Sequence, residues 1–196
     1  MGKSLVLQCD SFSIWKEQGI PIEAIEFLDS ISWGSDGAVY EHKNTKENFK
    51  FITNPYLISI TEADKIMGTA VFCNPQVTVA GHSFNYYYTR YFASSPVIRG
   101  RGVIKKLAIQ VMSSVREGET EKTIFVGFVE KGNKSSYKVS ESAGYRNIGT
   151  IKTVGFSRFF PKRSSKIQQV KTETEKQKVI ALLREQYSQH ALVQFD

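Results

Sequence analysis

The stretch Ser94–Val115, SSPVIRGRGVIKKLAIQVMSSV, places a glycine-containing turn directly before a segment with helical periodicity. Gly100 and Gly102 carry no side chain, so the main-chain N–H groups of this turn can approach an anion closely. A helix that begins here adds its unpaired N-terminal N–H groups and the positive end of its dipole. Together these features favour the binding of a pyrophosphate.

The residues after the turn predict an amphipathic helix that packs on a sheet. Apolar residues recur at positions 103, 104, 107, 108, 111, 112 and 115, and this spacing puts them on one helical face. The glycine pair by itself leaves an alternative, a strand-to-helix turn that needs only flexibility. The turn lacks both the Walker A pattern and the third glycine of the Rossmann fingerprint.

The composition is that of a globular protein. Of 196 residues, 41% are hydrophobic and 12% aromatic, which is enough for one core. No apolar run approaches the roughly 18 residues of a membrane span and no cleavable leader is recognisable, so we expect a cytoplasmic protein without a membrane partner. Cys9 and Cys73 have neither the number for a disulfide framework nor the neighbours of a zinc site, so we expect no metal.

The net charge of +7 suits a polyanionic partner. Nucleic acid, a membrane surface and a CoA-type cofactor with its phosphates all fit this charge. The lysines are scattered along the chain, and no zinc-finger or RNP-type sequence occurs. Nucleic-acid binding is therefore the less favoured of these functions.

The order of predicted elements indicates a mixed α/β fold with helices packed on a mostly antiparallel sheet. We expect strands at 5–9, 56–61, 66–72, 76–80, 83–92 and 123–129, with one or two closing strands within 148–160. We expect helices from Asp10 or Ser11 to Gln18, after Pro21, from Val103, and over 133–143 with Gly144 as its left-handed cap. Residues 33–48 are predicted to be an irregular loop, and the apolar strand 123–129 is predicted to be buried.

The tyrosine-rich strand before the turn presents two faces. Alternation puts one set of side chains on one face and another set on the other: Phe84, Tyr86, Tyr88 and Arg90 against Asn85, Tyr87, Thr89 and Tyr91. Two interpretations stay open: the tyrosines serve β propensity and packing, or one face lines an aromatic groove.

The C-terminal part is predicted to be separate from the main domain. We expect a domain over 1–160, a basic linker over 161–171, and a helix within 172–196 that begins with the capping box Thr172–Glu175. Two alternatives stay open for this helix. It folds back on the sheet, or it begins a truncated second module or pairs with another chain, as in a homodimer.

Two motifs resemble the GNAT superfamily of acyl-CoA-dependent N-acyltransferases. Arg99 and Gly102 match its Arg/Gln-x-x-Gly-x-Gly/Ala turn, although Ile104 stands where the family usually has a glycine or alanine. The second motif lies within Val129–Tyr145 and has an asparagine, a serine and a Gly-Tyr pair in the family's register: Asn133, Ser136, Gly144 and Tyr145.

The resemblance implies a sheet splayed between its fourth and fifth strands and transfer of an acetyl or other acyl group from acyl-CoA to an amine, by direct attack in a ternary complex. It also implies contacts between the CoA thioester and eleven residues: Phe92, Ala93, Ser94, Arg99, Gly100, Arg101, Gly102, Val103, Ile104, Asn133 and Ser136. The amine acceptor, a small molecule or a protein, is not identified. The family places its acceptor site at the helix and loop region before residue 48.

Three residues are catalytic candidates on the same resemblance. Ser140 occupies the position where the family often has a tyrosine that protonates the leaving thiolate. Tyr137 lies one helical turn earlier and could take over this role. Glu130 is the carboxylate nearest to the predicted gap between the splayed strands and could serve as the base. His42, His82 and His190 are interpreted as surface residues. Because Ser140 and Ile104 depart from the family pattern, a non-catalytic acyl-CoA-binding or interaction module is the alternative, with a basic nucleic-acid binder third.

Overall fold

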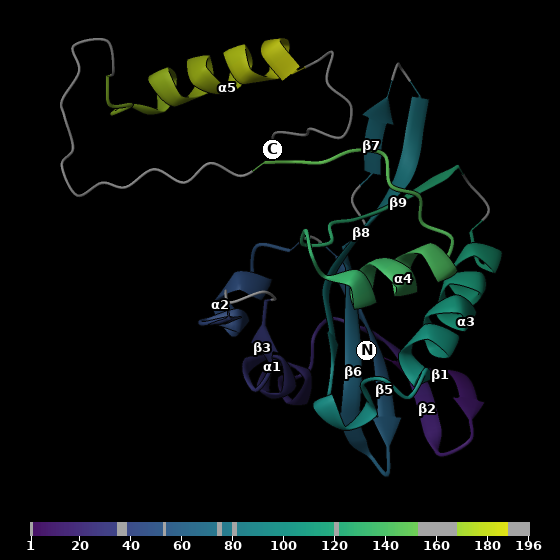
Figure 1. The fold of residues 1–196 in the computed structure, drawn as a ribbon. Coiled ribbons are helices and arrows are strands. Elements are labelled where there is room, and N and C mark those ends of the chain that lie inside the picture. Colours follow the sequence, from purple (N-terminus) through teal and green to yellow (C-terminus); the bar gives the residue numbers. More distant parts are fainter. Residues whose placement is uncertain are drawn as a thin grey trace. The chain divides into compact units, whose positions relative to one another are not determined.

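A computed structural model describes residues 2–34, 39–52, 54–73, 76–79, 82–119, 122–152 and 168–187. The chain forms two compact units, one of Met1–Gln76 with Ser83–Arg146 and one of Val77–His82 with Asn147–Asp196. The first unit holds the sheet and the predicted site (Figure 1). The second includes helix α5 (Glu173–Tyr187) and most of strand β7 (Gln76–Val79).

The sheet of the first unit is mostly antiparallel, as predicted. Its strand order is β1-β2-β5-β6-β8, and β9 pairs with β8 in the parallel direction. These strands are β1 (Lys3–Cys9), β2 (Phe12–Gln18), β5 (Pro55–Glu62), β6 (Lys65–Cys73), β8 (His82–Ser94) and β9 (Thr123–Gly127). The mixed α/β fold class is confirmed.

Helices cover both faces of this sheet (Figure 1). On one face, Tyr56 and Ile58 of β5 and Phe72 of β6 form a core with Leu107 and Val111 of helix α3 (Val103–Glu117). Helix α4 (Lys134–Ser142) packs against α3.

The other face has its own core. Leu57 and Val71 of the sheet pack with Ala24 and Leu28 of α1 (Ile22–Asp29) and with Phe49 of α2 (Thr45–Phe49). The alternation of apolar residues along β5 and β6 is what allows one sheet to support both cores.

The helix predicted after β1 is wrong, because residues 12–18 form strand β2. Asp10 adopts a left-handed φ of 56°, which closes a tight turn between Cys9 and Phe12. Phe12 and Ile14 are buried and alternate with more exposed residues, so the period is two rather than 3.6. The helix predicted after Pro21 is confirmed.

Two further segments differ from expectation. The predicted loop 33–48 contains the two-stranded pair β3 (Ser32–Trp33) and β4 (Tyr40–Glu41) as well as the start of α2. Strand β9 ends at Gly127, and its residues are only half-buried because no further strand pairs with it in the described part of the first unit. Phe128, predicted to be buried, is 60% exposed.

The C-terminal region is described in part. Residues 147–152 are not in a strand, so the closing strand expected from Ile148 does not begin there. The remainder of the predicted closing strands, residues 153–160, lies outside the described residues. Helix α5 begins with the predicted capping box: Thr172 N–H donates to Glu175 Oε2 (3.1 Å), and Glu175 N–H donates to Thr172 Oγ1 (3.2 Å). The domain limits at 160 and 171 stay predictions. Among the described helices, none combines the length and apolar character that a membrane crossing requires.

Candidate functional site

The glycine turn lies between the end of β8 and the start of α3. A short 3-10 helix, η1 (Pro96–Ile98), leads into it. The side chain of Arg99 folds back and donates two hydrogen bonds to the carbonyl of Ser94, from Nε (3.1 Å) and Nη2 (3.0 Å). Arg99 therefore anchors the turn to β8, a structural role that leaves the main chain to meet a ligand.

Gly100 and Gly102 both have left-handed backbone conformations, with φ of 76° and 75°. A Cβ atom added at either position would have no other atom within 4 Å. Only the backbone conformation, and not crowding by the protein, therefore favours glycine at these two positions. The space in front of both glycines is therefore open.

Helix α3 begins at Val103, with Gly102 as its N-cap. Lys106 N–H donates to the Gly102 carbonyl (3.1 Å), so the N–H groups of the first helical residues have no partner within the helix. The side chain of Ile104 points away from the turn, because its Cδ1 would lie 3.4 Å from a Cβ on Gly68 of β6. Ile104 therefore fits between α3 and the sheet, and its departure from the family pattern does not close the turn.

Strand β8 contains a bulge just before the turn. Thr69 of β6 pairs with Ala93 and Val71 pairs with Arg90, so two residues of β8 oppose one of β6. The bulge includes Tyr91, whose φ is 47° and whose carbonyl accepts a hydrogen bond from Thr69 Oγ1 (3.1 Å). The predicted faces are wrong here, because the extra residue moves Tyr91 to the α1 side, in the core that contains Ala93.

The sheet opens at the same place. Strand β9 pairs with β8 from Asn85 to Thr89, where the last pair is Thr89 with Gly127, while β8 continues to Ser94. Phe92, Ala93 and Ser94, the residues predicted beside the thioester, lie in this continuation. Phe92 packs in the α3 core and Ala93 packs in the α1 core. Residues 92–94 of β8 therefore lie between the α3 face and the α1 face of the sheet.

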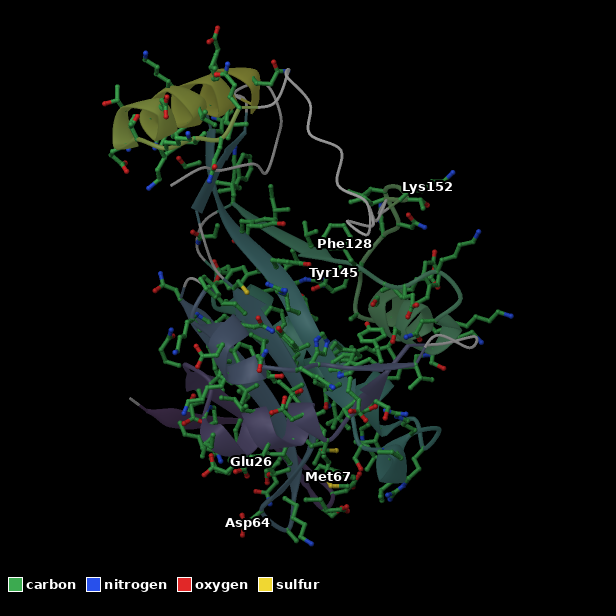
Figure 2. All side chains as sticks on the ribbon, turned by 90° about the vertical axis from the view of Figure 1, so that its left-hand side faces the viewer. Glu26, Asp64, Met67, Phe128, Tyr145 and Lys152 are labelled. Carbon is green, nitrogen blue, oxygen red and sulfur yellow. The ribbon has the colours of Figure 1, made fainter. Side chains whose placement is uncertain are left out.

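Tyr145 closes the inner end of the opening. Its hydroxyl is 2.8 Å from Thr89 Oγ1, the last β8 residue paired with β9. Burial raises the pKa of Tyr145, although Thr89 and Arg116 act in the opposite direction. In Figure 2, Met67, whose carbonyl accepts from Ser95 N–H (2.8 Å), lies closer to the Asp64 end of the sheet than Tyr145 does. The Gly-Tyr motif marked Tyr145 in the sequence but indicated no role for it.

The predicted residues of α4 have mainly structural contacts. Asn133 is the N-cap, and its Oδ1 accepts from Ser136 N–H (3.0 Å). Tyr137 is 39% exposed on the first turns. Ser140 is half-buried, and its carbonyl accepts from Tyr145 N–H (3.0 Å).

Glu130 is exposed in the loop between β9 and α4. Among the described residues, no hydrogen bond joins the side chains of Glu130, Tyr137 and Ser140. The structure places these three candidates on or beside one helix but does not assemble them into a catalytic group.

His42 was predicted to be a surface residue, but it is half-buried in an aromatic cluster on the α1 side of the sheet. Its ring is 4.9 Å from Trp33, 5.6 Å from Tyr40 and 5.2 Å from Tyr91, between centroids. Burial lowers the pKa of His42, Arg90 lowers it further, and Asp29 acts in the opposite direction. No local sequence pattern predicts this cluster, because its members come from three separate segments.

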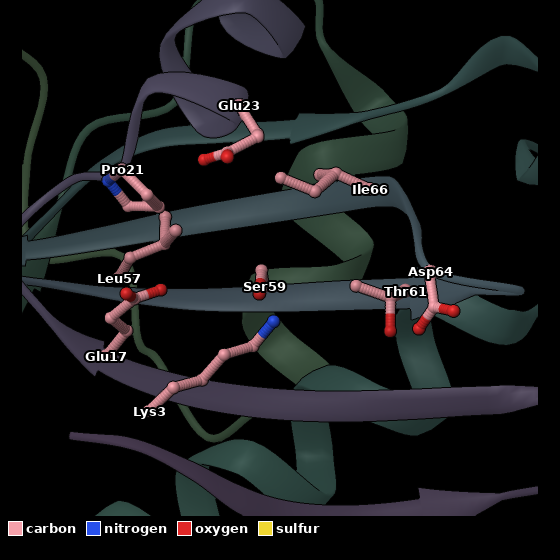
Figure 3. Close-up of a pocket in the computed structure, with 9 residues that line it drawn as sticks. All are labelled: Lys3, Glu17, Pro21, Glu23, Leu57, Ser59, Thr61, Asp64 and Ile66. Carbon is pink, nitrogen blue, oxygen red and sulfur yellow. The ribbon is translucent and has the colours of Figure 1, made fainter.

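A separate pocket of about 320 Å³ lies between β2, β5 and α1 (Figure 3). Ser59 and Thr61 of β5 lie along its floor, and charged side chains surround it: Lys3, Glu17, Glu23 and Asp64. None of the predicted cofactor or catalytic residues lines it, so this pocket is distinct from the turn.

Comparisons with solved structures find similar folds. A transcriptional regulator from Bacillus halodurans C-125 superposes with a TM-score of 0.51 at 13% identity, covering 73% of this chain and 99% of that one. A structure of AAC(6')-Iy in complex with the bisubstrate analogue CoA-S-monomethyl-acetylneamine gives 0.49 at 16% identity over 77% and 99% of the two chains. Glucosamine-6-phosphate N-acetyltransferase from Arabidopsis thaliana gives 0.46 at 18% identity over 78% and 100%.

No protein-family model matches the sequence, and a comparison with curated proteins finds no match. The strand order, the parallel β8–β9 pair that ends at Thr89, and the Arg99–Gly102 turn before α3 agree with the fold that the sequence resemblance to the GNAT superfamily implies.

Proposed function

We propose that the protein is an N-acyltransferase that moves an acetyl group from acetyl-CoA to an amine. The observation that carries this proposal is the open main-chain turn at Gly100 and Gly102, at the start of α3 and beside the opened end of β8. This is an arrangement that a diphosphate would fill. Acetyl-CoA supplies a thioester whose carbonyl carbon the amine nitrogen attacks, with cleavage of the C–S bond and release of the CoA thiol.

The chain's part is to bind and to position. Main-chain N–H groups from Gly100 to Lys105 bind the diphosphate, and the exposed cations of Arg101 and Lys105 add favourable charge. Phe92–Ser94 line the route through the opened sheet, with the glycine turn at one end and Tyr145 at the other. Asn133 and Ser136, which a hydrogen bond joins at the start of α4, are proposed to contact the cofactor. Such placement accounts for most of what acyl transfer requires from a protein.

Proton transfer needs a base on the acceptor side. An alkyl ammonium with a pKa near the lysine value of about 10.4 is mostly protonated at neutral pH and must lose a proton before attack. Glu130 and His42 are the two candidates. His42 is favoured, because its lowered pKa keeps the imidazole neutral near pH 7 and because it contacts Tyr91 of the bulge. The proton that the thiolate takes up comes from Tyr137 or from water held at Ser140.

A non-catalytic acyl-CoA-binding module is the second candidate. The absence of a hydrogen-bonded group among Glu130, Tyr137 and Ser140 in the described residues favours it. This alternative predicts binding of acetyl-CoA without release of thiol.

The test is release of free CoA thiol from acetyl-CoA across a panel of amines, measured beside binding of acetyl-CoA by thermal shift. We expect thiol release above the amine-free rate with at least one amine. A Tyr137→Phe variant decides whether that hydroxyl takes part. Binding without release would favour the module, and neither binding nor release at millimolar acetyl-CoA would refute both.

A further inference from the structure

Arg90 lies at the point where the sheet opens. It follows Thr89, the last residue of β8 paired with β9, and precedes Tyr91 in the bulge. Val71 is its partner on β6 and belongs to the α1 core, so Arg90 is on the α1 side. The glycine turn leads into α3, which covers the opposite face. An acyl group that passes through the opening from the turn would therefore emerge beside Arg90.

Two aromatic rings hold the Arg90 side chain in place. Its guanidinium carbon is 5.5 Å from the centroid of Tyr88 and 5.4 Å from that of Tyr91. The residue is exposed, and none of the ion pairs among the described residues includes it. A planar guanidinium that two rings orient, and that forms no ion pair with a carboxylate among the described residues, is suited to bidentate binding of a carboxylate or a phosphate.

Arg90 contributes a positive charge to this side of the opening. Burial has the largest effect on both groups, lowering the pKa of His42 and raising the pKa of Cys73. The charge of Arg90 has a smaller effect and lowers both pKa values. Asp29, the carboxylate whose charge acts on His42, accepts a hydrogen bond from Thr45 Oγ1. Each further positive charge on an acceptor would be repelled here, whereas a negative charge would be attracted.

An aromatic wall continues from Arg90 across the opening. Phe128, directly after β9, packs edge-on against Tyr88 with ring centroids 5.6 Å apart and is 60% exposed. Tyr88 and Tyr91 form the other part of this wall on β8. These rings can cover the apolar part of a small ligand whose anionic group is bound at Arg90.

We propose that the acceptor is a small amine that also carries an anionic group, carboxylate or phosphate, which Arg90 binds while the aromatic wall holds the apolar part. This inference rests on the proposed acyltransferase function and concerns the acceptor side of the same site. It excludes polycationic amines as good acceptors.

The experiment compares amines in pairs that differ mainly in the anionic group. Phenylalanine against phenethylamine tests the carboxylate, phosphoethanolamine against ethanolamine tests the phosphate, and spermidine represents a polycation. We expect the anionic member of at least one pair to have a kcat/KM about tenfold or more above its partner, the size of a charge-assisted contact. The Arg90→Gln variant should lose this preference and keep its affinity for acetyl-CoA, and Lys65→Gln, at the exposed β5–β6 turn, should keep both.

Binding of N-acetylphenylalanine and N-acetylphosphoethanolamine in the presence of CoA gives a readout that needs no turnover. We expect binding of at least one of them, weakened about tenfold or more by Arg90→Gln. Equal turnover of charged and uncharged partners, or unchanged preference in Arg90→Gln, would overturn the inference while leaving the acyltransferase proposal intact. If no amine is turned over, the acyltransferase proposal is refuted. If, in addition, neither N-acetylphenylalanine nor N-acetylphosphoethanolamine binds, the inference about Arg90 is overturned as well.

Discussion

Replacing Gly102 with alanine tests the glycine turn, and Gly19→Ala is its matched control. Both glycines are left-handed, with φ of 75° and 87°, and a Cβ at either would meet nothing within 4 Å. The alanine at each position therefore costs backbone strain alone, about 1–2 kcal/mol. We expect both variants to lose about the same free energy of unfolding, with a modest fall in Tm.

The two variants should differ in their response to acetyl-CoA. At a ligand concentration of about 100 times Kd, binding adds roughly 2.7 kcal/mol to the free energy of unfolding. The Cβ of Gly102→Ala stands in the open space in front of the turn. If it raises Kd tenfold, the gain at the same concentration falls by about 1.3 kcal/mol. Gly19 lies at the start of the segment between β2 and α1, outside the turn, so Gly19→Ala should keep the whole gain.

The assay is denaturant unfolding of the wild type and the two variants with and without acetyl-CoA. Comparing the gain within each protein removes the strain term, which is present in both of its measurements. A full ligand-induced gain in Gly102→Ala would refute our placement of the diphosphate. An equal loss of the gain in Gly19→Ala would show that backbone strain, and not the turn, controls binding.

Two further predictions concern buried hydroxyls and pH. Tyr145→Phe should lower the free energy of unfolding by about 1 kcal/mol, because the Tyr145 hydroxyl is hydrogen-bonded to Thr89. Tyr56→Phe should be neutral or stabilising, because the buried Tyr56 hydroxyl has no partner among the described residues. Denaturant midpoints check both, and a larger loss of stability in Tyr56→Phe than in Tyr145→Phe would contradict these hydrogen-bond assignments. The pKa of His42 is lowered below 6.5, so kcat/KM should be insensitive to this group above pH 6.5 and fall as the pH drops through the lowered value. Between pH 6.5 and the lowered pKa, the unfolded chain binds a proton at His42 more readily than the folded chain, so the free energy of unfolding also falls with decreasing pH. His42→Gln should remove both the activity dependence and the stability dependence on pH. A pH profile of kcat/KM that His42→Gln leaves unchanged would exclude His42 as the base.

The local features of the fold could be predicted from the sequence. The period of α3, the left-handed cap at Gly144 and the capping box of α5 depend on residues only a few positions apart, and all three are present. The helix prediction for strand β2 rests on Asp10 or Ser11 as a possible N-cap, whereas in the structure a left-handed Asp10, which the sequence does not specify, closes a tight turn there.

The acceptor side of the site depends on long-range packing. The bulge at Tyr91 adds one residue to β8, and strict alternation along the sequence contains no signal for such an addition. The aromatic cluster around His42 joins residues of three segments, so no local spacing could reveal it. The turn was therefore predictable, and the surroundings of Arg90 and His42 required the structure.

The most direct test of the account is calorimetric titration of the wild-type protein with acetyl-CoA and, separately, with acetyl-pantetheine, which carries the thioester but no diphosphate. If the N–H groups of Gly100–Lys105 bind the diphosphate, acetyl-CoA should bind at one molecule per chain and acetyl-pantetheine at least tenfold more weakly. Equal affinity for the two ligands would show that the turn contributes nothing, and no heat from acetyl-CoA at millimolar concentration would contradict the proposed function itself.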